Sequence, residues 1–169
     1  MILQMTLLLF TAAAAWRDFC SYQIPNRLIL AGFLNGCILQ LFLNGWSGIA
    51  SGLAGAGMML LLCGILFGLS MIGAGDVKLL MVIAVYTGLE KSFKIGLLSL
   101  ILGAVLSLFK MLQYGILQER MAYFAWYVRN IHQNKATPYV DMTHLQSASR
   151  YVIPFAGPVF LATLASVLF

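Results

Sequence analysis

The sequence predicts an all-α integral membrane protein, a polytopic helical bundle of about six transmembrane helices with its N-terminus outside the cytoplasm. Apolar residues make up 62% of the 169 residues, whereas a soluble globular domain has about 45–50%. Charged residues make up 9%, against roughly 25% in soluble domains. A soluble domain of this size cannot bury so much apolar surface, and disorder requires low hydrophobicity with high charge. Both classes are therefore excluded.

The apolar residues form runs that predict the individual spans. A helix needs about 20 apolar residues to cross a bilayer core. The candidate spans are residues 1–16, 28–46, 48–72, 77–89, 94–116 and 151–169. The first and fourth are short, which local thinning of the bilayer or burial against longer neighbours can accommodate. We find no internal repeat and expect a single membrane domain over residues 1–169.

The first span resembles a signal peptide in its apolar middle and its alanine-rich end. A signal peptide carries positive charge before its apolar segment, but the first basic residue here is Arg17, which follows that segment. We therefore expect residues 1–16 to be retained as the first helix. In the third span, Gly48, Gly52 and Gly55 have spacings that allow close approach between helices.

The distribution of Lys and Arg predicts the orientation. With the N-terminus outside, the loops near residues 17–27, 73–76 and 117–150 are cytoplasmic. The basic residues on this side are Arg17, Arg27, Lys78, Lys110, Arg120, Arg129, Lys135 and Arg150, and those outside are Lys91 and Lys94. Basic residues concentrate in cytoplasmic loops of membrane proteins, and the opposite orientation would reverse this bias.

The long loop over residues 117–150 has two parts. Its first part mixes aromatic residues with Arg120 and Arg129, which is typical of an interfacial helix on the cytoplasmic surface. Its second part is polar and contains His132 and His144, which lack nearby acids at metal-ligand spacing. We therefore expect no zinc site. The cysteines form no C-x-x-C pair, and no basic run is long enough to indicate nucleic-acid binding.

The chemistry points to two of the five carboxylates. Glu90, Glu119 and Asp141 lie in polar or interfacial segments, where we expect them to be solvated. Asp18 closes the first predicted helix and Asp76 opens the fourth, both on the cytoplasmic side. Acidic residues at the membrane are candidates for function. The structural alternatives are that Asp76 caps its own helix and that Asp18 is a cap or a partner of Arg17 or Arg27.

The flanking residues favour a functional site. Gly73 and Gly75 precede Asp76 and permit backbone conformations, and a close approach of a substrate strand, that other residues would prevent. After Asp18, Pro25 makes Ile24 extended or turn-like, and this turn would begin the second helix just below Asp18. Lys78 could stabilise the Asp76 carboxylate or hold a substrate, although a lysine at a helix end more often extends to the headgroups.

Two carboxylates on one face of the membrane suggest aspartic-protease chemistry. Like charges held close together share a proton. The ionised member deprotonates a water molecule that attacks the peptide carbonyl, and the protonated member stabilises the charge that develops on the carbonyl oxygen. The pair titrates as a unit, so neither residue is assigned a fixed role. The G-x-S-x-G and Walker motifs of serine hydrolases and nucleotide-binding proteins are absent from the sequence.

Three segments resemble the type IV prepilin leader peptidases, which are membrane aspartic proteases of the G-x-G-D type. Gly73-Ala74-Gly75-Asp76-Val77-Lys78-Leu79 matches the G-x-G-D-x-K-L form of this family. The segment from Asp18 to Ile24-Pro25-Asn26 is similar to the region of its first aspartate. Ile153-Pro154-Phe155 resembles its C-terminal element, with one additional residue before Pro158.

The resemblance implies that Asp18 and Asp76 are the catalytic pair, with Gly73, Gly75, Lys78, Pro25, Asn26 and Pro154 shaping the site. It also implies an enzyme of the bacterial inner membrane, without a cofactor, that cleaves the short basic leader of prepilins or pseudopilins at the cytoplasmic face. The chain lacks the N-terminal C-x-x-C extension of the bifunctional members. It is therefore similar to the short peptidases of Tad-type pilus systems, and N-methyltransferase activity is not expected. Presenilin-like proteases are a poorer match, because no Pro-Ala-Leu element is found.

The alternative from another class is a non-enzymatic membrane subunit, either of a pilus or secretion assembly or of a transporter. In that case the two acids would serve as ion-binding or helix-docking sites. Transporters often contain repeated halves and broken helices at the bilayer midplane. The absence of a repeat, and the position of both acids at one edge, disfavour transport.

Overall fold

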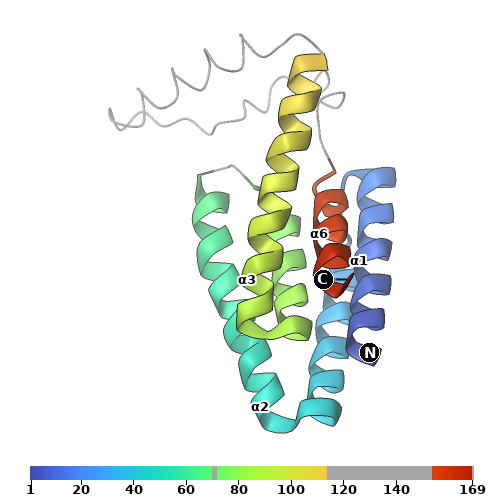
Figure 1. Cartoon of the computed structure of the whole chain (residues 1–169), viewed down its shortest axis with the longest axis vertical. Coiled ribbons are helices and arrows are strands. Elements are labelled where there is room, and N and C mark those ends of the chain that lie inside the picture. The colour runs from blue at the N-terminus through green and yellow to red at the C-terminus, as the bar shows by residue number, and fades with distance from the viewer. Residues whose placement is uncertain (70–71, 114–153, 169) are drawn as a thin grey trace.

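The computed structural model describes residues 1–69, 72–113 and 154–168 (Figure 1). These residues form four helices and no strand: α1 (Ile2–Ser21), α2 (Asn26–Gly68), α3 (Ala74–Gln113) and α6 (Ala156–Leu168). The predicted all-α class is confirmed for this part of the chain. The long loop predicted over residues 117–150, with its interfacial helix, lies outside the described residues.

Two glycines divide the long helices α2 and α3. Gly45 has φ 64° and ψ −157° inside α2, and Gly88 has φ 75° and ψ −177° inside α3. This region of φ/ψ space is essentially restricted to glycine. Each long helix therefore folds back on itself as a hairpin, as Figure 1 shows for α2. The two breaks coincide with the predicted ends of the second and fourth spans.

The helices differ in detail from the predicted spans. Helix α1 continues beyond residue 16 to Ser21 and includes Asp18. The segment after Gly88 is helical from its beginning, although residues 90–93 were expected in a loop. This helical continuation is possible because Gly88 alone makes the turn, so that no longer connection is needed.

The first half of α3 is the centre of the bundle. Its buried side chains include Leu79, Leu80 and Ile83, each at most 1% exposed. Helix α3 packs mainly against α2, and α6 packs against both α1 and α3. The short span predicted over residues 77–89 is thus covered by its neighbours, which is one of the two expected ways to accommodate a short span.

Glycines of α2 allow its close contact with α3. A β-carbon on Gly52 would lie 2.6 Å from the backbone oxygen of Val85, and one on Gly55 would lie 3.1 Å from the backbone carbon of Gly88. The prediction of close helix approach is confirmed for these two residues. It is wrong for Gly48, which faces Asn44 and Gln40 of its own helix across the Gly45 break.

A buried glutamine satisfies the backbone at the α3 break. Gln40 is 5% exposed, and its Nε2 donates hydrogen bonds to the carbonyl oxygens of Val85 and Tyr86 at 3.0 and 2.9 Å. In an uninterrupted helix these oxygens would accept from the amides four residues later, but the break at Gly88 separates them. Asn44 in turn donates to Gln40 Oε1 at 2.6 Å.

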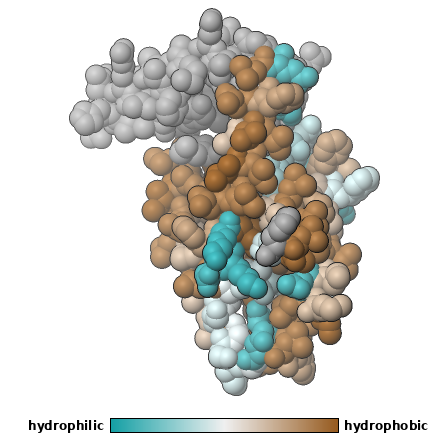
Figure 2. All heavy atoms as spheres, viewed as in Figure 1, coloured by the Kyte–Doolittle hydropathy of each residue, from teal (hydrophilic) through white to brown (hydrophobic). Residues whose placement is uncertain are grey.

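The outer surface of the bundle is strongly apolar. Phe42, Trp46 and Leu61 are 81%, 80% and 72% exposed, and Figure 2 shows apolar residues over most of the visible helical surface. By length and composition, Asn26–Gly68 and Ala74–Lys110 could cross a membrane. Apolar surface of this extent is characteristic of a protein that contacts lipid or another protein.

Candidate active site

Asp18 lies in the last turn of α1, and its carboxylate accepts a hydrogen bond from the first residue of α6. Its side chain is 7% exposed, and its Oδ2 accepts a hydrogen bond from the backbone N–H of Ala156 at 3.0 Å. Ala156 is the first residue of α6, and the N-terminus of a helix favours negative charge. This contact therefore stabilises a carboxylate that is almost fully removed from solvent.

The structure decides between the alternatives for Asp18. Its carboxylate caps a helix 138 positions later in the chain instead of its own helix. Among residues 1–69, 72–113 and 154–168, the one ion pair joins Lys94 to Glu90. The alternative in which Asp18 pairs with Arg17 or Arg27 is therefore wrong for the described residues.

A tight chain reversal follows Asp18. Tyr22 adopts the left-handed conformation (φ 51°, ψ 24°), and its N–H donates to the carbonyl oxygen of Asp18 at 2.8 Å, as is common at helix ends. Pro25 then precedes α2 with φ −65° and ψ 134°. Helix α2 begins at Asn26, directly after Pro25, so the predicted turn does precede the second helix, which starts two residues before the predicted span.

Asp76 lies in the first turn of α3 and is half-buried. Its N–H donates to the carbonyl oxygen of Gly73 at 3.1 Å. Because α3 begins at Ala74, Asp76 is the third helical residue, and the alternative in which it is the N-cap is wrong. The Asp18 carboxylate is near enough for its charge to act on Asp76, so the two predicted acids lie together at one end of the bundle.

The two glycines before Asp76 differ in their surroundings. Neither lies in the left-handed region, so the expectation of an unusual backbone conformation is wrong for both. A β-carbon on Gly73 would lie 3.2 Å from Oδ2 of Asp76, whereas one on Gly75 would lie 4.0 Å from the β-carbon of Ile24. Gly73 leaves room for the Asp76 carboxylate, and Gly75 has space for a methyl group.

The other predicted site residues lie at the same end of the bundle. Lys78 is exposed, and its Nζ donates to Oδ1 of Asn26 at 3.0 Å. Lys78 therefore links the starts of α2 and α3 and forms no ion pair with Asp76. Pro154 is half-buried just before α6, and its carbonyl oxygen accepts from Gly157 at 3.4 Å.

Sequence reasoning did not identify Ala156 as part of this site. Its contribution is a backbone N–H, which every residue other than proline carries, so its side chain gives no signal. The neighbouring Ile153-Pro154-Phe155 motif marked the correct segment, but it did not indicate which group of α6 meets Asp18.

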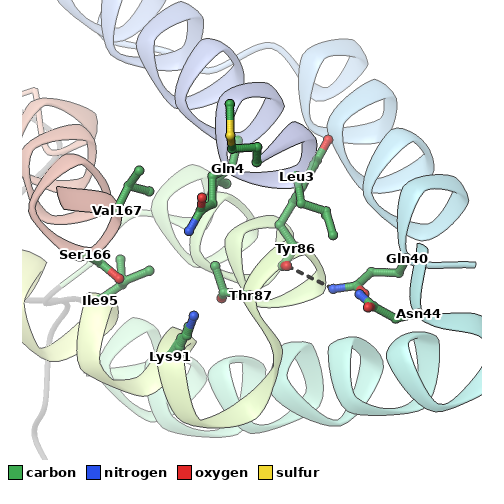
Figure 3. A pocket seen from close by; sticks show the side chains of 12 residues that line it. Leu3, Gln4, Gln40, Asn44, Tyr86, Thr87, Lys91, Ile95, Ser166 and Val167 are labelled. Atoms are coloured by element: carbon green, nitrogen blue, oxygen red, sulfur yellow. Dashed lines mark hydrogen bonds between the residues drawn. The ribbon is translucent and has the colours of Figure 1, made fainter. Parts of the chain in front are cut away.

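A cavity of about 320 Å³ lies at the opposite end of the bundle (Figure 3). Four helices line it, and its polar residues are Gln4, Gln40, Asn44, Tyr86, Thr87, Lys91 and Ser166. The ammonium group of Lys91 and the amide of Gln4 point towards its interior. This cavity is separate from the two carboxylates. In the described part of the chain, no three His, Cys, Asp or Glu side chains come together as they would around a metal ion.

Comparison with known proteins gives one family match. A family model described as the type IV leader peptidase family matches residues 5–108, which is more than half of the chain. The matched region contains Asp18, Asp76 and the whole segment from Gly73 to Leu79. No curated protein and no solved structure matches the chain.

Proposed function

The chain belongs to the type IV leader peptidase family, and from this we propose that it is a membrane aspartic endopeptidase with Asp18 and Asp76 as its catalytic pair. Its substrates are prepilins or pseudopilins, from which it removes the short basic leader at the cytoplasmic face. We assign it to the bacterial inner membrane as a multi-pass protein whose chemistry requires no cofactor.

The observation that carries the proposal is that the two carboxylates lie near each other at one end of the bundle. Asp18 and Asp76 come from different helices, and the charge of one acts on the other. Two carboxyl groups in this relation hold one proton between them over a range of pH. Such a pair supplies both a base for the attacking water and an acid for the carbonyl oxygen.

The surroundings of the pair suit a prepilin. Arg17, Arg27 and Lys78 occur at the same end of the bundle as the carboxylates, and positive charge favours the cytoplasmic side. The exposed apolar surface of the helices suits the bilayer. A prepilin presents an apolar helix to the bilayer and its leader to the cytoplasm, so its cleavage site would lie at the level of Asp18 and Asp76.

The test is co-expression with candidate prepilins from the same genome, with leader removal followed by gel shift and N-terminal sequencing. We expect the parent to cleave, and Asp18→Asn and Asp76→Asn each to remain inserted and lose cleavage by at least about 10³-fold, as expected when one member of a cooperating pair is removed. Glu90→Gln is the matched control, because Glu90 is exposed and paired with Lys94 at 2.7 Å.

The outcomes separate the proposal from its alternatives. Full cleavage by either Asp→Asn variant would exclude the pair as the catalytic machinery. If the parent is inserted but cleaves no candidate, a non-enzymatic assembly subunit or a transporter component would be favoured instead. No contact among the described residues gives specific support to that class.

A further inference from the structure

We propose that the N-terminus of α6 makes Asp18 the ionised member of the pair and leaves the shared proton on Asp76. Asp18 is then the general base and Asp76 the general acid. The assignment of these catalytic roles rests on the function proposed above. The protonation order itself is a property of the folded chain and can be measured without any substrate.

The first argument is the hydrogen bond at Asp18. A backbone N–H stabilises the charged form of the carboxyl group that accepts its hydrogen bond. The bond from Ala156 is 3.0 Å long. The Asp18 side chain is 7% exposed, and this burial by itself disfavours the charged form, so the hydrogen bond acts against the effect of burial. The aligned peptide dipoles of α6 act in the same direction, whereas those of α1, which ends just after Asp18, act in the opposite direction.

The position of α6 keeps this donor in place. The hydroxyl groups of Thr11 in α1 and Thr163 in α6 are 3.3 Å apart, and both residues are fully buried. Near the start of α6, the Phe155 ring packs on Gly103 so closely that a β-carbon there would lie 2.8 Å from Cε2. Ala156 is therefore held on both sides, against α1 and against α3.

Asp76 has only a weaker contact of this kind. The backbone N–H of Gly73 lies near its carboxylate and favours the charged form, but residues 1–69, 72–113 and 154–168 give that carboxylate no hydrogen bond of normal length and angle. It rests against Gly73 and is exposed to the charge of Asp18. When one proton is shared between two carboxyl groups, it resides on the one whose anion is stabilised less.

The other charged groups at this end do not reverse the difference. Lys78 donates to Asn26, and neither Arg17 nor Arg27 forms an ion pair with a described carboxylate. The described residues of α6 carry no titratable side chain. Cys20 and Tyr22, on the connection after α1, are exposed. Among the described residues, the principal charged neighbour of Asp76 is therefore Asp18.

The assignment gives a balanced reaction. One oxygen of Asp18 takes a proton from water, the water oxygen bonds to the peptide carbonyl carbon, and Asp76 gives its proton to the carbonyl oxygen. Asp18 then donates its proton to the amide nitrogen while a hydroxyl of the gem-diol returns a proton to Asp76. The C–N bond breaks, and the pair is restored with Asp18 ionised and Asp76 protonated.

The direct test is a ¹³C NMR titration of the full chain in detergent micelles or nanodiscs, with label at the aspartate carboxyl carbons. The three aspartates, Asp18, Asp76 and Asp141, are assigned with single Asp→Asn variants. We expect the Asp18 signal to keep the shift of an ionised carboxylate at pH values where Asp76 is protonated. The opposite order, or two transitions that coincide, would overturn the inference.

A second variant tests the cause. Ala156→Pro removes the N–H group that donates the hydrogen bond to Asp18. Proline is well tolerated at the first position of a helix. Gly157→Ala is the control, because a β-carbon there has no neighbour within 4 Å and every N–H is retained. We expect Ala156→Pro to move the Asp18 transition upward by about one pH unit, and Gly157→Ala to leave it unchanged.

The results distinguish this inference from the proposed function. If Asp18 ionises first but no prepilin is cleaved, the protonation order stands and the proposed function fails. If prepilin is cleaved but Asp76 ionises first, the function stands and the assignment of roles fails. If Ala156→Pro does not fold, as judged by circular dichroism, the titration of the parent chain decides the matter.

Discussion

Gly73 lies directly against the carboxylate of Asp76: a β-carbon on Gly73 would be 3.2 Å from Oδ2. This distance is shorter than ordinary van der Waals contact, so a β-carbon at position 73 requires the carboxyl group to move by a few tenths of an ångström. The role of this glycine is therefore to leave space, since its φ angle lies outside the left-handed region.

We predict that Gly73→Ala lowers kcat/KM for prepilin cleavage by about tenfold or more, because small displacements of a catalytic group are costly. Gly75→Ala is the matched control, since its β-carbon would lie 4.0 Å from that of Ile24. It should retain nearly full activity. Equal losses in the two variants would show that crowding of Asp76 is not the cause.

We predict a bell-shaped dependence of kcat/KM on pH. At low pH both carboxyl groups are protonated and no base remains, so activity falls as the pH decreases. At high pH both are ionised and no acid remains, so activity falls again. Cleavage of a fluorogenic prepilin peptide across the pH range measures both limbs. Activity that only rises with pH would argue against a shared proton.

We predict that Gln40→Leu destabilises the protein by about 2–4 kcal/mol, because it leaves the buried carbonyl oxygens of Val85 and Tyr86 without a partner. Thermal unfolding in detergent measures the loss. Asn44→Ala is the control, since it removes only the contact to Gln40 Oε1, and it should cost less than half as much. Similar losses would mean that the two backbone contacts are not the main contribution.

We predict opposite effects for two glycines of the same helix. Gly52→Ala would place a β-carbon 2.6 Å from the backbone oxygen of Val85, which forces α2 and α3 apart at a cost of about 1–3 kcal/mol. Gly57 has no neighbour within 4 Å of such an atom, so Gly57→Ala should stabilise by about 0.5–1 kcal/mol through helix propensity. The two unfolding midpoints should therefore move in opposite directions, and a shared direction would contradict the packing.

Much of the fold could be predicted from local sequence properties. Apolar runs predicted the helices, and the predicted ends of the second and fourth spans lie within one residue of the breaks at Gly45 and Gly88. Hydropathy could not predict that Gly88 makes a turn by itself, because it does not report on backbone angles. The crossing of a membrane by six helices, and the position of the N-terminus outside, stay predictions.

The candidate site was predicted in part. Motif reasoning placed Asp18 and Asp76 on one face of the membrane, and in the structure the Asp18 carboxylate is near enough for its charge to act on Asp76. It gave Gly73 and Gly75 the same role, although only Gly73 contacts the acid. It also considered that Lys78 stabilises the Asp76 carboxylate, whereas its Nζ binds Asn26.

The sequence by itself determined which segments are helices and where the two acids stand along them. These properties depend on the hydropathy and backbone preferences of each segment, which are local. Only the tertiary structure decided that Ala156 meets Asp18 and that Gln40 meets the broken backbone of α3. Such contacts join groups 138 and 45 or 46 positions apart, and they exist only once the helices have packed at a definite distance and rotation.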